Sequence, residues 1–247
     1  MDVLGIDIGG SGIKGAPVDT ITGGMLSDRH RIPTPRPSTP SAVTAVVAEI
    51  VASFEWDGPV GCALPSVVQQ GIVRTAANID KAWIGVRGAE AFSEAVGRPV
   101  TLLNDADAAG LAEMRFGAGR DHAGVVMMLT FGTGIGSGLF VDGRLVPNTE
   151  FGHMEINGME AEHYAAGRLQ EEMGMSFDDW GDRVSEVLGY LHRLFWPDLF
   201  IVGGGISKEW EEWSDRLVVP TQVVPAQLRN HAGIVGAALA TAERVEI

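Results

Sequence analysis

The stretch GIDIGGSGIKGA, residues 5–16, decides how the rest of the chain is interpreted. It joins two apolar runs through a glycine-rich turn. Its glycines and polar residues include Asp7, Gly9, Gly10, Ser11, Gly12 and Lys14. The glycines let backbone amides turn toward a bound anion, and Ser11 and Lys14 add a hydroxyl and a positive charge. The spacing is not that of a P-loop, so the stretch is either a tight hairpin or a different kind of phosphate loop.

A second glycine-rich stretch, TFGTGIGSGLF at residues 130–140, repeats the pattern of strand, turn and strand. Its candidate phosphate-binding residues are Thr130, Gly132, Thr133 and Gly134. A third glycine run, Gly203, Gly204 and Gly205, follows an apolar strand near the end of the chain. The three turns together favour nucleotide or polyphosphate binding over plain hairpins. The repetition predicts two similar domains that face each other across a cleft.

Composition limits the classes of protein to consider. The chain has 247 residues, of which 45% are hydrophobic and 20% charged, which is typical of a globular protein. A formal net charge of −14 argues against general binding to nucleic acid or to acidic membranes. The single cysteine, Cys62, excludes an internal disulfide and a multi-cysteine zinc site. No signal peptide or membrane span is expected, so we expect a cytoplasmic protein.

The order of the elements predicts an α/β fold. In the first half we expect strands within residues 2–9, 12–19, 25–35, 59–65 and 99–105, with helices at 41–54 and 105–117. In the second half we expect strands and a hairpin within 124–146, a helix over 176–196, a strand from 199 and a closing helix over 231–245. The helix over 176–196 has an apolar face formed by Val184, Val187, Leu188, Leu191, Leu194 and Phe195, and Pro197 ends it. Such alternation is typical of sheets that contain parallel strands.

Asn104 and Asp105 lie where a predicted strand becomes a helix. The carboxyl ends of strands line the binding crevice of an α/β sheet, so Asp105 could act as a base toward an acceptor hydroxyl. The alternative is that Asp105 caps the helix, a role that Asp107 could fill instead.

A polar cluster interrupts the apolar sequence at NTEFGHMEI, residues 148–156. Glu150, His153 and Glu155 could bind several sugar hydroxyls in a fixed pattern. A metal site and a solvated acidic loop are the alternatives. Asn78 could also bind sugar, and Trp83 either stacks on a ring or packs in the core.

These stretches, taken in order, resemble the polyphosphate glucokinases of the ROK group of sugar kinases, within the actin/hexokinase-like superfamily. The resemblance runs over nearly the whole chain. It implies two actin-like (ribonuclease H-like) α/β domains with the active site in the cleft between them, and a homodimer. The expected domains are residues 1–104, with the helix at 233–247 packed back on them, and residues 105–232.

The same resemblance implies phosphoryl transfer from polyphosphate, and often ATP, to the 6-hydroxyl of glucose. Asp105 would be the catalytic base, and the sugar would be bound by Asn78, Asn104, Glu150, His153 and Glu155. Asp7, Gly9, Gly10, Ser11 and Lys14 would form one phosphate loop, and Thr130, Gly132, Thr133 and Gly134 the other. Gly203, Gly204 and Gly205 would lie near the adenosine of ATP. Mg²⁺ would bind through the donor phosphates, and Asp7 could hold it through water.

The sequence also departs from the family pattern. No cysteine follows the Gly152-His153 pair, so no structural zinc is expected, and Ser66 stands where a glycine is usual. The alternatives are a glucokinase that uses ATP alone, a sugar-responsive protein without catalytic activity, and an actin-like ATPase. For a long polyphosphate donor, a basic strip of Arg74, Lys81, Arg87 and Lys208 is expected.

Overall fold

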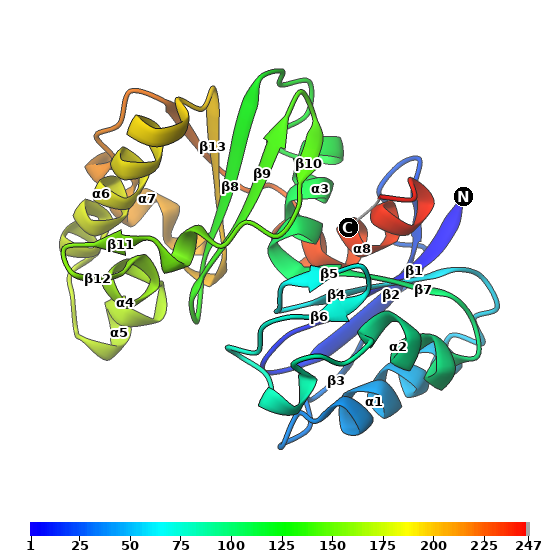
Figure 1. Ribbon diagram of the computed structural model, residues 1–247. Coiled ribbons are helices and arrows are strands. Elements are labelled where there is room, and N and C mark those ends of the chain that lie inside the picture. Colours follow the sequence, from blue (N-terminus) through cyan, green and yellow to red (C-terminus); the bar gives the residue numbers. More distant parts are fainter. Residues whose placement is uncertain (246–247) are drawn as a thin grey trace. The chain divides into compact units, whose positions relative to one another are not determined.

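The structure is a computed structural model that describes residues 1–245 (Figure 1). The chain divides into two compact units. The first unit is Met1–Ala112 together with the segment from Asn230 onward, and the second is Glu113–Arg229. The division falls inside helix α3, Asp105–Phe116, whereas the sequence analysis placed a boundary at the first residue of that helix. A helix shared by two units shows no change of composition that would mark the border.

The first unit contains a five-stranded sheet in the order β3-β2-β1-β4-β7. Its strands are β1 Asp2–Ile8, β2 Ile13–Asp19, β3 His30–Ile32, β4 Val60–Leu64 and β7 Val100–Asn104. Strands β1, β2 and β3 pair antiparallel, and β1, β4 and β7 pair parallel. The carboxyl ends of β1, β4 and β7 therefore meet at one edge of the sheet.

Four helices accompany this sheet: α1 Pro40–Ser53, α2 Gly88–Val96, α3 and α8 Ala232–Ala242. The closing helix α8 lies directly on β1 and β4 (Figure 1). Glycines in the strands permit this approach, because a β-carbon on Gly5 or Gly61 would lie 2.0 Å from a carbonyl oxygen of α8. The unit also contains the hairpin of β5 Val68–Gln69 and β6 Ile72–Val73, and the 3-10 turn η1 Lys81–Trp83. Trp83 is fully buried and stacks on Phe92, so it packs in the core and does not stack on a ligand.

The second unit repeats the strand order of the first. Its sheet has the order β10-β9-β8-β13-β14. The strands are β8 Val125–Phe131, β9 Ile135–Val141, β10 Arg144–Val146, β13 Leu199–Gly203 and β14 Gln222–Pro225. Three strands pair antiparallel at one side, and β8, β13 and β14 pair parallel. The internal repetition expected from the two glycine stretches is confirmed at the level of topology.

Shorter elements of the second unit follow the sheet's antiparallel strands. They are η2 Phe151–His153, β11 Glu155–Ile156, β12 Met159–Glu160, α4 Ala161–Ala165 and α5 Arg168–Glu172. Beyond the long helix α6, Phe177–Phe195, come η3 Gly205–Glu209, α7 Trp210–Trp213 and η4 Ser214–Arg216, and η5 Arg229–His231 precedes α8.

Helix α6 begins at the Ser176 cap, whose hydroxyl accepts from the Asp179 amide, and ends just before Pro197 as predicted. Its predicted apolar face is correct only as far as Leu191. Leu194 and Phe195 were expected on that face but are 65% and 36% exposed, because the last turn of the helix extends beyond the core it covers. Among the described residues, no helix is both long and apolar enough to cross a membrane.

Candidate active site

In the first unit, the predicted site residues gather at the carboxyl edge of the parallel strands. Asp7 on β1 lies opposite Ala63 on β4, and Leu64 lies opposite Asn104 on β7. The first glycine turn and the Asn104-Asp105 junction therefore lie at the same sheet edge. This is the edge at which α/β sheets bind their ligands.

The first glycine turn is closed by a hydrogen bond from the Gly9 amide to the Gly12 carbonyl. Lys14 Nζ lies 3.5 Å from Asp7 Oδ2, and both side chains are about one-fifth exposed, at 22% and 19%. Burial raises the pKa of Asp7 above its usual value, although the charges of Lys14 and Arg29 act to lower it. The turn thus has a paired carboxylate and ammonium at its base, and exposed backbone at its tip around Gly10 and Ser11.

Asn104 caps α3, a role that the sequence analysis had considered for Asp105 and Asp107. Its Oδ1 accepts from the amides of Ala106 at 2.8 Å and Asp107 at 3.0 Å. Its Nδ2 donates to the carbonyl of Ser66 at 3.2 Å. The side chain that accepts from both amides at the start of α3 is therefore that of Asn104. Three neighbouring residues can all cap a helix, and the sequence alone does not show which one has the right backbone.

Asp105 is the first residue of α3 and is half-buried. Its Oδ1 accepts from the Ala106 amide at 2.8 Å. Because Asn104 supplies the helix cap, the carboxylate of Asp105 is held at the sheet edge by short local contacts on a rigid helix start. That is the setting a positioned base requires.

Two further residues of this unit lie near the same edge. A β-carbon on Gly10 would lie 4.0 Å from the Asn78 carbonyl oxygen, so the structure brings Asn78 to the first glycine turn. Ser66 is only 2% exposed, and its Oγ has no hydrogen-bond partner among the described residues. A buried hydroxyl of this kind carries unused donor and acceptor capacity next to Asn104.

In the second unit, the second and third glycine turns lie together. Gly203 at the end of β13 is opposite Thr130 on β8. Gly204 has a backbone φ of +91°, and a β-carbon there would lie 2.2 Å from the Phe131 carbonyl oxygen. Only glycine fits this close approach, which packs the third turn against the strand that leads into the second.

The second turn is held by a residue that the sequence analysis missed. Gly132 donates to the Gly134 carbonyl at 3.0 Å, which closes the turn. Arg168 donates its amide to the Gly132 carbonyl at 3.0 Å, and its Nε to the Thr133 carbonyl at 2.7 Å. Arg168 begins α5 and has no local motif around it, so only the fold reveals this contact.

The polar cluster of the second unit centres on His153. Its Nδ1 lies 3.2 Å from Glu160 Oε2, and its Nε2 lies 3.7 Å from Glu150 Oε2. Partial burial acts to lower the pKa of His153, but the hydrogen bond to Glu160 and the charges of the surrounding carboxylates outweigh it and raise the pKa. Burial raises the pKa of Glu150, and the charge of Glu162 adds to the effect while His153 opposes it.

Glu160 and Glu162 belong to this cluster, although the sequence analysis did not select them. The β11–β12 hairpin folds back so that α4 follows next to η2. A β-carbon on Gly134 would lie 2.5 Å from Glu162 Oε2, so this carboxylate also reaches the second glycine turn. Glu155, which was selected, lies opposite Glu160 on the hairpin and is exposed.

One group of these side chains has the spacing of a metal site. His153, Glu160 and Glu162 each offer a ligand atom, and the three atoms lie within 4.8 Å of one another. Imidazole and carboxylate ligands suit zinc and similar divalent ions. The cluster is partly exposed, and exposed acidic groups commonly occur without a metal.

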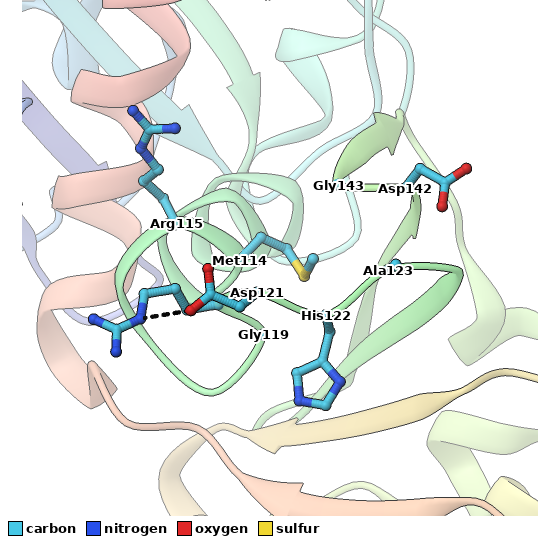
Figure 2. A pocket seen from close by; sticks show the side chains of 9 residues that line it. Met114, Arg115, Gly119, Asp121, His122, Ala123, Asp142 and Gly143 are labelled. Atoms are coloured by element: carbon cyan, nitrogen blue, oxygen red, sulfur yellow. Dashed lines mark ion pairs between the residues drawn. The ribbon is translucent and has the colours of Figure 1, made fainter.

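A separate cavity of about 540 Å³ lies at the opposite end of the second unit's sheet. It is lined by the last turn of α3, by residues that follow this helix and by the Asp142-Gly143 turn between β9 and β10. Figure 2 shows that Arg115, His122 and Asp142 point in different directions. Arg120 is paired with Asp121 at 3.5 Å. These side chains do not converge on a common point, so this cavity is not the candidate site.

The chain is similar to proteins of known activity over almost its full length. The sequence profile described as "ROK family" matches residues 3–169. The polyphosphate glucokinase of Mycobacterium tuberculosis strain H37Rv is 52% identical over 239 residues, which is 96% of this chain and 90% of that protein. The glucokinase of Streptomyces coelicolor is 30% identical, covering 95% of this chain and 96% of that protein.

Solved structures also match this chain over nearly its full length. The inorganic polyphosphate/ATP-glucomannokinase from Arthrobacter sp. strain KM superposes with a TM-score of 0.95 at 46% identity, covering 98% of this chain and 99% of that one. A ROK family glucokinase from Streptomyces griseus, in complex with glucose and AMPPNP, gives 0.85 at 27% identity, with 98% and 100% covered. The predicted fold class, an actin-like α/β fold, is confirmed by these structures and by the repeated sheets.

Proposed function

The chain belongs to the ROK family, and we propose that it is a glucokinase that transfers a phosphoryl group from inorganic polyphosphate or ATP to the 6-hydroxyl of glucose. The observation that carries this proposal is the position of Asp105. Its carboxylate is fixed at the start of α3 by the neighbouring cap of Asn104, at the sheet edge that also carries the first glycine turn. The similarity to a polyphosphate glucokinase and to a polyphosphate/ATP-glucomannokinase supports both donors.

In this proposal Asp105 is the catalytic base. It orients the 6-hydroxyl of glucose and accepts its proton as the new oxygen–phosphorus bond forms and the bridging P–O bond of the donor breaks, which releases ADP or the shortened polyphosphate. Phosphoryl transfer needs little covalent chemistry from the protein, so the placement of the hydroxyl is the main contribution of this carboxylate. Asn104 fixes the backbone on which Asp105 stands.

Each unit carries side chains that we propose as sugar ligands. The second unit supplies Glu150 and His153, to which we add Glu162 because it is close to both. We keep Glu155 among the proposed sugar-binding residues, as the sequence predicted. The first unit supplies Asn78 and Asn104. The buried Ser66 hydroxyl, which has no partner among the described residues, adds a donor and acceptor for a sugar hydroxyl.

Each unit also carries a glycine turn that we propose as a phosphate-binding element. Backbone amides of Gly9, Gly10 and Ser11, with the ammonium of Lys14, neutralise charge in the first unit. Thr130, Gly132, Thr133 and Gly134 do the same in the second. Gly203, Gly204 and Gly205 lie near the adenosine when ATP is the donor. The match to a glucokinase with bound AMPPNP supports this arrangement.

Mg²⁺ is the cofactor that this chemistry requires. The partly exposed carboxylate of Asp7 offers oxygen ligands beside the first turn, which fits an ion that prefers oxygen and keeps its water. Asp7 would hold the ion through water. When bound, the ion neutralises charge on the donor phosphates.

The proposal extends to the location, assembly, binding partners and metal content of the protein. We propose a cytoplasmic homodimer that binds neither nucleic acid nor membrane and contains no structural zinc.

A kinase assay that crosses polyphosphate and ATP with glucose and mannose tests the proposed activity, and metal analysis of chelator-washed protein tests for zinc. Use of ATP alone would indicate an ATP-dependent glucokinase. Glucose binding without turnover would indicate a sugar-responsive protein, and ATP hydrolysis without a sugar acceptor an actin-like ATPase.

A further inference from the structure

The segment Arg29–Arg36, here called the basic segment, has a charge opposite to that of the chain as a whole. It contains Arg29, His30, Arg31 and Arg36, and no acidic residue occurs from residue 29 to residue 48. The whole chain has a formal net charge of −14. A local concentration of arginine in an acidic protein is a feature that attracts anions.

The sheet places this segment beside the first glycine turn. On β3, Arg31 lies opposite Lys14 of β2, and Lys14 lies opposite Asp7 of β1. The charge of Arg29 is also close enough to act on the pKa of Asp7. The basic segment is therefore the strand edge next to the proposed phosphate loop, in the same unit.

Two hydrogen bonds fix the segment to the turn. Arg31 Nη2 donates to the Ser11 carbonyl at 2.9 Å, and the Thr34 hydroxyl donates to the Gly9 carbonyl. The guanidinium of Arg31 fills the space over Gly12, where a β-carbon would lie 2.6 Å from its Nε. Arg31 is thus held against the turn, and the Thr34 contact keeps the following residues of the segment beside it.

The three arginines have unused capacity for anions. All three are exposed, and in residues 1–245 none of them forms an ion pair with a carboxylate. By contrast, Arg87, which the sequence analysis placed in a basic strip, is paired with Glu90 at 2.9 Å. The guanidinium fork matches phosphate oxygens closely, so unpaired arginines are well suited to a polyphosphate.

The residues that follow the basic segment connect it to Lys81. Ser38, two residues after the segment, accepts the Asp80 amide at 3.1 Å through its Oγ and the Trp83 Nε1 at 2.9 Å through its carbonyl. These bonds tie the segment to η1, which carries Lys81. Of the four residues expected in the strip, Lys81 is the one that these contacts connect to the basic segment.

We propose that the basic segment binds the part of a polyphosphate chain that extends beyond the phosphates held by the first glycine turn. This inference rests on the proposed use of polyphosphate as donor. Arg36 follows Arg31 by five positions, a reach of up to about 18 Å in a fully extended chain. A long polyphosphate can follow the segment away from the turn, whereas we expect the three phosphates of ATP to stay at the turn.

The test uses the double variant Arg29→Ala/Arg36→Ala, because neither side chain contacts the glycine turn. The control is Arg144→Ala, which removes an exposed arginine on β10, at the end of β9 opposite the second turn. Two quantities are measured: KM with long-chain polyphosphate, tetrapolyphosphate and ATP, and equilibrium binding of long-chain polyphosphate without glucose.

For the double variant we expect KM and Kd for long-chain polyphosphate to rise about tenfold, which corresponds to about 1.4 kcal/mol, because two exposed charge contacts are lost. KM for ATP and tetrapolyphosphate should stay within about twofold, and the control should match the wild type. Equal losses for ATP and long polyphosphate, or unchanged polyphosphate binding, would overturn the inference. If the wild type phosphorylates glucose with neither donor, the proposed function fails, and the binding measurement still decides on the basic segment.

Discussion

Glu160 Oε2 lies 3.2 Å from Nδ1 of His153, on the side of the imidazole ring away from the Nε2 that faces Glu150. The carboxylate keeps a proton on Nδ1 and fixes the plane of the ring. His163 lies 3.7 Å from the same oxygen, so Glu160 connects two histidines. In the proposed enzyme, Glu160 therefore positions the ring of His153.

Replacement of Glu160 should change sugar affinity more than turnover. Glu160→Ala removes the acceptor, and KM for glucose should rise about tenfold, the value of a hydrogen bond to a charged group. Glu160→Gln retains an acceptor oxygen and should restore most of the affinity. Steady-state kinetics with saturating donor measure both. An alanine variant with the KM of the wild type would remove Glu160 from this role.

The pKa of His153 should exceed the ordinary value of 6.5. Because the folded-state pKa is raised, protonation of His153 favours the folded protein below the ordinary pKa, and this contribution disappears as pH rises through the raised value. The effect on stability should be small, since the side chain is 45% exposed. NMR titration of the ring protons measures the midpoint directly. It should lie above 6.5 in the wild type and fall in Glu160→Gln; a midpoint below 6.5 would contradict the assignment.

Loss of the α3 cap should lower both stability and activity. Asn104→Ala removes two hydrogen bonds to the helix start and should lower the free energy of unfolding by about 1 kcal/mol or more. It should also lower kcat, because Asp105 loses its anchor. Thr39→Ala is the matched control: it removes the side-chain cap of α1, so stability should fall while kcat is retained. Denaturant unfolding and kcat measured on both variants decide the point; equal kcat in the two would show that the cap does not serve Asp105.

Adjacent glycines in the third turn should respond differently to the same change. Gly204→Ala places a methyl group 2.2 Å from the Phe131 carbonyl at a φ of +91°, so the free energy of unfolding should fall by about 2 kcal/mol or more. Gly205→Ala meets nothing within 4 Å and should leave stability nearly unchanged. Thermal unfolding of the pair checks this, and similar melting temperatures for the two variants would contradict the described packing.

The sequence predicted the features that local pattern determines. Two apolar runs joined by a glycine turn predicted the repeated sheet, because such a turn reverses the chain and lets the two runs pair as antiparallel strands. Periodicity also predicted α6, but it assigned Leu194 and Phe195 to the buried face, since a period says which side is apolar and not how far the core extends.

The site was predicted less completely because some of its contacts depend on tertiary structure. Glu160 and Glu162 reach His153 only because the β11–β12 hairpin reverses the chain. Arg168 reaches the second glycine turn from the next helix. Charged residues such as these look like ordinary surface residues until the fold places them. The choice of Asn104 as cap depends on backbone geometry that the run of three capping-type residues within 104–107 does not reveal.

The central claim is that Asp105 is the base of a kinase that phosphorylates glucose. It is tested most directly by the rate of glucose 6-phosphate formation with polyphosphate and with ATP, in the wild type and in Asp105→Asn. We predict product with both donors in the wild type, and a loss of roughly a hundredfold to ten-thousandfold in kcat in the variant, with glucose binding retained. A wild type that makes no product with either donor, or a variant within a few-fold of the wild type, would contradict the account.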